Sequence, residues 1–263
     1  MLKARIIPFL LLRDSGLTKT VQFKNGKYVG DPLNAVKIFN EKEADELTFL
    51  DIDASVQNKS PNFKLLEKIA EQARMPICYG GGINNVEHAK RIIELGIEKI
   101  AISSAGINNF NLLEEIGSSI GVQSVVCVLD YKKSGFFGKQ EIFTQNGTKK
   151  SGIDLFDHIK KLNSSELIGE LVINGIDHDG TSSGYDYDTI QKVREIFDGP
   201  LTVIGGCKDH DDIHKLIKQF PVIGAGVGSS FVFKGKYKAV LINYPTKNEK
   251  DKILSNETVN SII

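Results

Sequence analysis

Eight short apolar runs, each followed by a segment with helical spacing of its apolar residues, constrain the fold of this chain most strongly. Because the runs are apolar at nearly every position, they are typical of strands buried on both faces of a parallel sheet. Eight strand–helix alternations favour closure into a single (β/α)8 barrel. The expected strands are Arg5–Leu11, Leu47–Asp53, Ile77–Tyr79, Lys99–Ile102, Ser124–Asp130, Glu170–Asn174, Leu201–Ile204 and Val222–Ala225.

An open, doubly wound sheet is the alternative, but Gly80–Gly82 does not form the Gly-x-Gly-x-x-Gly motif of dinucleotide-binding folds. The barrel is expected to occupy residues 1–245, and the polar residues 246–263 to form a mobile C-terminal extension; the alternative is that its last residues dock locally. The expected helices are Pro32–Asn40, Asn62–Ala73, Val86–Leu95, Phe110–Gly117, Asp154–Leu162, Tyr187–Phe197 and Asp209–Gln219, with a shorter one at Lys236–Ile242.

Composition excludes several classes of protein. The 263 residues include 33 basic and 33 acidic side chains, so no net field attracts nucleic acid or an anionic membrane. No run approaches the roughly 18 apolar residues of a membrane span, and the start lacks a signal-peptide pattern, which predicts a cytoplasmic protein. The three cysteines and five histidines lack the spacing of metal or redox motifs, so no metal or cofactor is expected.

A motif repeats at half the length of the chain. Met75–Ile83 and Gly199–Gly206 each contain a proline, an apolar run and a glycine turn, and Gly80 and Gly205 are 125 residues apart. The spacing predicts a two-fold repeat of half-barrels, at about residues 1–120 and 121–245. Glycine turns after buried strands let an anion approach backbone N–H groups. The pair therefore predicts two phosphate sites and a substrate that is phosphorylated at both ends.

Two long connections after the first and fifth strands contain hairpin patterns. Residues 22–29 predict a hairpin that turns at Asn25-Gly26, and residues 140–148 predict a second one. Both follow the carboxyl ends of strands, where barrel active sites form. Their separation by four strand–helix units fits the half-barrel repeat.

Acidic residues end two of the predicted strands. Asp130 follows five apolar residues, which suits a general acid or base with a raised pKa; the alternative is a loop cap paired with Lys132 or Lys133. Asp51 and Asp53 share one strand face, so both are expected near the barrel mouth. There one of them binds substrate hydroxyls or, alternatively, pairs with Lys19 or with loop backbone.

Further turns complete the predicted phosphate sites. The loop from residue 174 to 186 is rich in small polar residues, and Gly226–Phe231 is a glycine–serine turn that enters a short helix. The latter matches the phosphate site that barrels commonly build after strands seven and eight. Ser103-Ser104 with Gly81-Gly82 is its partner in the other half-barrel.

Taken together, Arg5-Ile6-Ile7, Phe49–Ile52, Gly80–Ile83, Asp177–Asp186 and Gly228-Ser229 resemble the HisF family over about residues 1–245. HisF is the cyclase subunit of imidazole glycerol phosphate synthase. The resemblance implies a barrel that docks a HisH-like glutaminase as a heterodimer. Ammonia from that partner would pass through the barrel to a bisphosphorylated substrate at the opposite face.

The resemblance also assigns residues. Family members have a ring of four charged residues at the amino-terminal mouth, the ammonia gate; an ordinary ring of salt bridges that closes the barrel floor is the alternative. At one phosphate site Ser103 stands where the family usually has Asn. At the other, Cys207-Lys208 replaces a pair of small residues. The positions implied are Arg5, Glu46, Lys99 and Glu170 for the gate, and Lys19, Asp51, Gly82, Ser103, Ser104, Asp179, Gly180, Gly206, Gly228 and Ser229 for substrate and phosphate.

The catalytic positions depart from the family pattern. HisF enzymes use two aspartates, and Asp130 matches one of them, but the other falls at Leu11. Leucine cannot transfer a proton, and general acid–base help is typically worth about 10²- to 10⁴-fold. Asp14 aligns with a different acidic loop residue and is a poor substitute.

These observations favour a HisF-like subunit of a glutamine amidotransferase that conducts ammonia to a different acceptor. A branch of the family similar to this chain is associated with surface-polysaccharide (lipopolysaccharide) biosynthesis, where a separate sugar amidotransferase is thought to receive the ammonia. The first alternative is a genuine cyclase (a lyase) of histidine biosynthesis that relies on Asp130. The second is a non-catalytic scaffold that activates the glutaminase. An isolated phosphosugar isomerase would not explain the charged ring.

Overall fold

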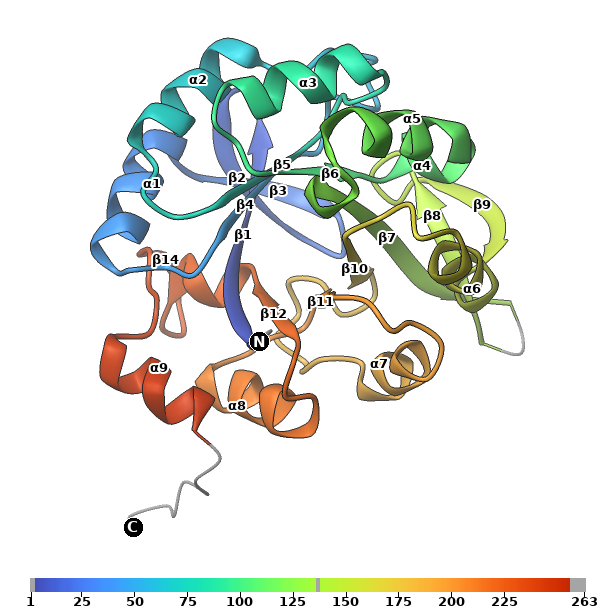
Figure 1. Cartoon of the computed structure of the whole chain (residues 1–263). Helices are drawn as coiled ribbons and strands as arrows, with labels where there is room; N and C mark the ends of the chain where they lie inside the picture. The colour runs from blue at the N-terminus through green and yellow to red at the C-terminus, as the bar shows by residue number, and fades with distance from the viewer. Residues whose placement is uncertain (1–2, 136–137, 256–263) are drawn as a thin grey trace.

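Eight parallel strands close into a barrel in the computed structural model, which describes residues 3–135 and 138–255. Each strand pairs with the next one along the chain, and pairing of β12 with β1 completes the ring, as the predicted (β/α)8 fold requires. Helices surround it in Figure 1. The barrel strands are β1 (Arg5–Arg13), β4 (Leu47–Asp51), β5 (Ile77–Gly80), β6 (Lys99–Ile102), β7 (Val125–Ser134), β10 (Glu170–Gly175), β11 (Leu201–Ile204) and β12 (Gly224–Val227).

The helices begin at polar caps and bury one face against the strands. Asp31, Asn62 and Asn85 accept hydrogen bonds from the first-turn N–H groups of α1, α2 and α3. None of the helices among the described residues is long and apolar enough to span a membrane. The helices between strands are α1 (Pro32–Glu41), α2 (Phe63–Gln72), α3 (Val86–Glu94), α4 (Ser104–Asn108), α5 (Phe110–Ile120), α6 (Leu155–Ser165), α7 (Tyr187–Arg194) and α8 (His210–Gln219), with 3₁₀ turns η1 (Val122–Ser124) and η2 (Ser229–Phe231).

Alternation along the strands divides the core in two. Most buried residues lie between the strands and the helices. A smaller group, which includes Ile7, Phe9, Val126, Val128 and Val172, fills the barrel interior. Because neighbouring residues of a strand point to opposite faces, one strand can supply both groups, as β7 does with Val125 and Cys127 outside and Val126 and Val128 inside. This explains why the runs are apolar at nearly every position.

Hairpins extend the sheet where the sequence predicts them, but one turn differs. β2 (Gly16–Val21) and β3 (Lys24–Gly30) follow β1, while β8 (Lys139–Thr144) and β9 (Lys149–Asp154) follow β7. The first hairpin turns at Gln22-Phe23 and not at Asn25-Gly26, which lie within β3. Gln22 and Phe23 have φ of 49° and 64°, so tertiary contacts impose a left-handed turn on residues that do not favour it.

Two predictions near the C-terminus are wrong. Residues 236–242 form no helix; a small hairpin of β13 (Phe233–Lys234) and β14 (Ala239–Val240) takes their place. The extension at 246–255 is not a mobile tail, because α9 (Lys247–Leu254) packs against α8. Thr246 and Glu249 form a capping box at its start, and Ile253 is buried. Residues 256–263 lie outside the described part of the chain.

Candidate active site

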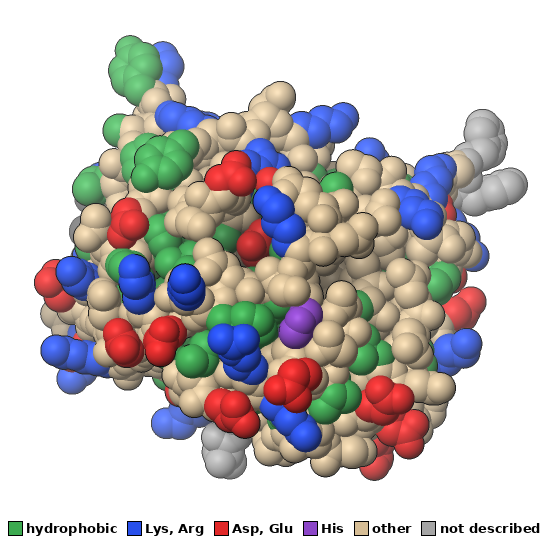
Figure 2. Space-filling view, turned by 90° about the horizontal axis from the view of Figure 1, so that it is seen from above, with side chains coloured by type: hydrophobic (Ala, Val, Ile, Leu, Met, Phe, Trp, Pro, Cys, Tyr) green, Lys and Arg blue, Asp and Glu red, His purple; other side chains and the backbone are tan. Residues whose placement is uncertain are grey.

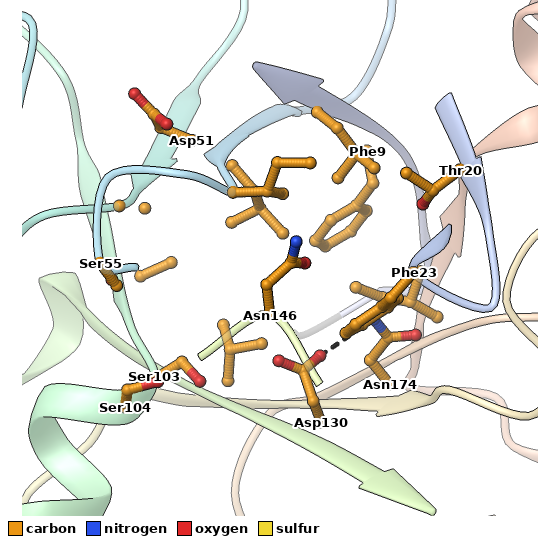
Figure 3. A pocket seen from close by; sticks show the side chains of 18 of the residues that line it. Phe9, Thr20, Phe23, Asp51, Ser55, Ser103, Ser104, Asp130, Asn146 and Asn174 are labelled. Carbon is orange, nitrogen blue, oxygen red and sulfur yellow. Dashed lines mark hydrogen bonds between the residues drawn. The ribbon is translucent and has the colours of Figure 1, made fainter. Parts of the chain in front are cut away.

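A cavity opens at the carboxyl ends of the barrel strands. Figure 3 shows Asp51 and Asp130 on opposite sides of it, with Ser103 and Ser104 along one edge. Of the residues predicted to bind substrate or phosphate, Gly180 and Gly206 do not line the cavity. The structure brings together on its wall Lys19, Asp51, Gly82, Ser103, Ser104, Asp130, Asp179, Gly228 and Ser229.

Asp130 lies where β7 leaves the barrel, and its carboxylate accepts a 3.0 Å hydrogen bond from the Asn174 side-chain amide on β10. Burial raises the pKa of Asp130 to about 7, although the Asn174 hydrogen bond works in the opposite direction. A carboxyl group with such a pKa exchanges protons near neutral pH, as a general acid or base must. Lys132 pairs with Asp177 instead, 3.6 Å away, so the predicted alternative of a pair with Asp130 is not formed there.

Leu11 lies on the same cavity wall, at the end of β1, where it adds apolar surface. Asp14 is exposed at the turn between β1 and β2 and is absent from the cavity lining. Asp14 therefore does not replace the carboxyl group missing at position 11.

Lys19 and Asp179 form a second titratable pair in the cavity. The ammonium group of Lys19 is buried and donates to the carbonyl oxygen of Phe9. Burial lowers the pKa of Lys19 to about 8, while the charge of Asp179 opposes this shift. Burial likewise raises the pKa of Asp179 to about 6, against the effect of Lys19. A cation beside the Gly228-Ser229 turn suits a phosphate ligand.

Asp51 and Asp53 have separate partners. The Asp51 carboxylate accepts from the N–H groups of Asp53 and Ala54, at 3.2 and 3.1 Å, and burial raises its pKa. Asp53 lies beyond the end of β4 and pairs with Arg13 at 2.9 Å. Only Asp51 lines the cavity, so the expectation that both face the mouth is wrong for Asp53.

The two glycines outside the cavity wall shape the loop that borders it. Gly180 has φ of 70°, and a Cβ there would clash with the Thr20 carbonyl oxygen. Gly206 accepts a hydrogen bond from Gly184 N–H at 2.8 Å, which closes the loop of residues 176–186 onto β11. Lys208 is exposed and pairs with Asp209 at 3.6 Å, so it does not crowd the cavity.

The turns of the two hairpins meet over the cavity. Phe23, from the β2–β3 turn, and Asn146, from the β8–β9 turn, both line it. Gly147 is so close to Phe23 that a Cβ would lie 2.7 Å from the ring. Ser104 accepts a hydrogen bond from Gln145 N–H at 3.2 Å, which fixes this turn above the predicted phosphate site. The sequence predicts both hairpins on this face, but no local pattern distinguishes Phe23 or Asn146.

At the opposite end of the barrel, four charged side chains form a closed ring. Arg5 contacts Glu46 at 2.5 Å and Glu170 at 2.7 Å, while Lys99 contacts each glutamate at 2.9 Å. Burial alone would raise the pKa of Glu170, but Arg5 and Lys99 outweigh it and hold the pKa below its usual value. These are the four residues predicted to form the gate.

A second, much smaller internal space lies between the ring and the active-site cavity, with room for about one water-sized molecule. Glu46 and Glu170 border it on the ring side, and it shares Phe9, Ala101 and Val128 with the cavity. Between the ring and the cavity, the barrel axis is therefore lined by closely packed, mostly apolar side chains. The remaining lining of the smaller space consists of Ile7, Thr48, Cys78, Val126, Val172 and Thr202.

Asn174 is the polar residue nearest the candidate acid that the sequence analysis did not single out. It is 6% exposed, and its side-chain oxygen has no hydrogen-bond partner in the structure. Its place directly after the apolar run Leu171–Ile173 of β10 could have identified it. Thr20 and Ser55 also line the cavity, but nothing in the sequence distinguishes them from other loop hydroxyls.

Comparisons with known proteins agree with this geometry. The family model described as "Histidine biosynthesis protein" matches residues 5–238. The chain is 54% identical, over 97% of both chains, to a Vibrio vulnificus protein named "Putative imidazole glycerol phosphate synthase subunit hisF3". It is 43% identical to the hisF2 protein of the same description from Pseudomonas aeruginosa, over 95% of this chain and 99% of that one.

A third relative is the imidazole glycerol phosphate synthase subunit HisF of Natranaerobius thermophilus. Identity is 34%, over 93% of this chain and 96% of the relative. The matches cover nearly the whole barrel, including the cavity and the ring. The chain therefore belongs to the HisF family of imidazole glycerol phosphate synthase subunits.

Proposed function

We propose that this HisF-family barrel receives ammonia from a HisH-like glutaminase and conducts it to an acceptor other than the imidazole-forming substrate. The acceptor reaction is the amidation of a surface-polysaccharide sugar by a separate amidotransferase. The observation that carries the proposal is a combination of two features. The ring of four charges is complete, but the cavity contains Leu11 together with Asp130, where two aspartates would be expected.

The interior between ring and cavity suits ammonia in its neutral form. Its walls are mostly apolar, and burying an ammonium ion in such surroundings is far more costly than burying a small neutral molecule. The Thr48 and Thr202 hydroxyls and the Cys78 thiol provide weak polar contacts along the way.

A surface beside the cavity mouth supports docking of the acceptor enzyme. It consists of residues 24–28 and 234–241, called here the rim surface, in which Lys27 joins the hairpins by donating to Lys238 O at 3.4 Å. Tyr28 is 69% exposed and Tyr237 is 90% exposed. The rim surface contains five lysines and no carboxylate. At the upper left of the view in Figure 2, hydrophobic side chains lie beside Lys and Arg side chains, with some Asp and Glu side chains nearby. Exposed aromatic residues among cations favour a protein with an acidic surface.

The second candidate function is genuine imidazole glycerol phosphate synthesis. The raised pKa of Asp130 and the retention of Lys19, Gly82 and Ser229 on the cavity wall favour it. In that case the chain would convert the bisphosphorylated aminoimidazole carboxamide ribonucleotide intermediate and ammonia into imidazole glycerol phosphate and the released carboxamide ribonucleotide.

An assay of the purified chain with that intermediate and ammonium salt separates the two candidates. We expect turnover about 10²- to 10⁴-fold below that of a HisF enzyme with both aspartates, because one proton-transfer group is missing. Leu11→Asp should raise the rate, and Leu11→Asn, which has similar size but no titratable group, is the matched control. Turnover at an ordinary enzyme rate by the unaltered chain would refute the proposal.

A negative result also needs interpretation, because a pure scaffold would be inactive too. The chain is therefore mixed with a HisH-like glutaminase and the sugar amidotransferase, and transfer of ¹⁵N from glutamine amide to the sugar is measured. Transfer supports the conduit. Stimulated glutamine hydrolysis without transfer, unaffected by ligands at the Asp130 face, identifies a scaffold.

A further inference from the structure

The C-terminal segment is bonded to residues beside the charged ring. The Tyr244 hydroxyl donates to Ile6 O at 2.9 Å and accepts from Asp45 N–H at 3.2 Å. The Asp45 carboxylate accepts from Ile6 N–H at 3.0 Å and pairs with Lys250, on α9, at 2.7 Å. Lys250 also donates to Glu43 O at 3.0 Å. The network thus joins the start of β1, the residues before β4 and the C-terminal segment.

The network is well packed. Tyr244 is 1% exposed, and its ring makes edge contacts with Phe39 and Phe231 at centroid distances of 6.1 and 5.2 Å. On α9, Ile253 is buried, and its carbonyl oxygen lies 3.0 Å from a ring nitrogen of His214. These contacts fix the segment at two points, so the hydroxyl of Tyr244 has a defined position.

The hydrogen-bond network around Tyr244 and Asp45 lies directly beside the charged ring. Ile6 follows Arg5, and Asp45 precedes Glu46, so the network holds the neighbours of two ring members. Residue pairing between β1 and β4 begins only at Phe9 and Thr48. Ile6 therefore lies before the paired part of β1 and β4. There the Asp45 carboxylate binds its N–H group and the Tyr244 hydroxyl binds its carbonyl oxygen. Arg5 and Glu46 then meet at 2.5 Å across this junction.

We propose that Tyr244 and Lys250 are positioning residues for the charged ring, and that the C-terminal segment sets the alignment of Arg5 with Glu46. The inference rests on the proposed function only in treating the ring as the entrance of the ammonia path. Loss of the Tyr244 hydroxyl frees both the Ile6 carbonyl and the Asp45 N–H. The start of β1 then moves relative to β4, and the ring contacts loosen.

Amide hydrogen exchange and carboxyl titration by NMR test this on the full-length chain alone. In Tyr244→Phe, we expect the Ile6 N–H to exchange about 5- to 10-fold faster, because a hydrogen bond of ordinary strength has been removed from the network. The pKa of Glu170, which Arg5 and Lys99 hold low, should move toward its usual value. Tyr187→Phe is the control, because that hydroxyl bonds only to Asp212 O on the outer helices.

A second pair of variants covers the case in which Tyr244→Phe does not fold. Lys250→Met should cause the same two changes. Lys250→Arg keeps the ion pair with Asp45, so it should leave the Ile6 exchange rate and the Glu170 pKa as they are in the unaltered chain. Lys252→Met removes the same charge from the exposed face of α9 and should change neither quantity. Unchanged Ile6 exchange and unchanged Glu170 titration in a folded variant would overturn the inference. Since neither readout involves a glutaminase or an acceptor, failure of the proposed function would leave both results as they are.

Discussion

The two ends of the barrel differ in how their charges are balanced. At the amino-terminal end, each cation of the ring contacts both glutamates, so four partly buried charges neutralise one another. At the carboxyl end, Asp130 and Lys19 are buried and form no ion pair with another residue among those that the structure describes, and burial moves their pKa values to about 7 and about 8. A self-compensating ring is stable without a ligand, whereas buried groups with shifted pKa values are costly and typical of functional sites. The ring end is therefore balanced by itself, whereas the cavity end has buried groups that suit a ligand.

The largest expected effect comes from removing one charge of the ring. Glu170→Gln leaves Arg5 and Lys99 with Glu46 as their only anionic partner in the ring, and breaking a buried ion pair typically costs about 3–5 kcal/mol. Because the cations are about a quarter exposed, we expect a loss of about 2–3 kcal/mol in the free energy of unfolding. Urea denaturation at pH 7 measures it.

Glu94→Gln is the control for this experiment, since Glu94 is exposed on α3. Its expected change is below about 0.5 kcal/mol. Equal effects of the two substitutions would mean that the ring is an ordinary surface network, and the contrast between the two ends would disappear.

An effect of similar size, but opposite sign, is expected at the other end. The pKa of Asp130 is about 7 in the folded chain and near 3.8 when unperturbed. The folded state therefore binds the proton more tightly, and the free energy of unfolding falls as pH rises from about 4 to about 7. Asp130→Asn removes this dependence and should stabilise the chain by about 2–4 kcal/mol at pH 8.

Denaturation of both chains at pH 4 and pH 8 checks the sign. Near pH 4 the two should differ little, because Asp130 is protonated in the folded state and the Asn side chain can still accept from Asn174. Glu115→Gln, at an exposed position of α5, should not reproduce the pH-dependent gain. A variant that is less stable than the parent at pH 8 would show that the carboxylate is compensated after all.

Most of the barrel could be predicted because its signal is local and repeated. The strands at Lys99–Ile102 and Leu201–Ile204 have the predicted bounds, since buried runs are flanked by polar residues and prolines or glycines. Val222–Ala225 is two residues early because Val222 is apolar yet 43% exposed. Periodicity cannot distinguish an apolar residue at the surface from one in the strand.

Candidate-site residues divide along the same line. Asp51 ends β4, and Asp130 lies at the end of the apolar run of β7, where that strand leaves the barrel to pair with β8, so the positions of both follow from the sequence. The places of Phe23 and Asn146 depend on how two hairpins fold over the cavity, which is a long-range property. The prediction for Asp53 is wrong because β4 ends at Asp51, two residues earlier. Beyond the end of a strand, side chains no longer alternate between its two faces.

The smallest expected effect on stability concerns the rim surface, which adds a third element to the comparison. Tyr237 is 90% exposed, so Tyr237→Ala should change the free energy of unfolding by less than about 0.5 kcal/mol. If the rim surface docks the acceptor enzyme, the same substitution should weaken that complex by about 10-fold or more, because exposed tyrosines often dominate interfaces. Sedimentation of the purified pair at low and high salt measures this, and affinity should fall as salt screens the five lysines. Tyr187→Phe on the outer helix α7 is the matched control. If neither Tyr237→Ala nor salt changes the affinity, the acceptor enzyme docks on another face and the rim surface has no role in binding it.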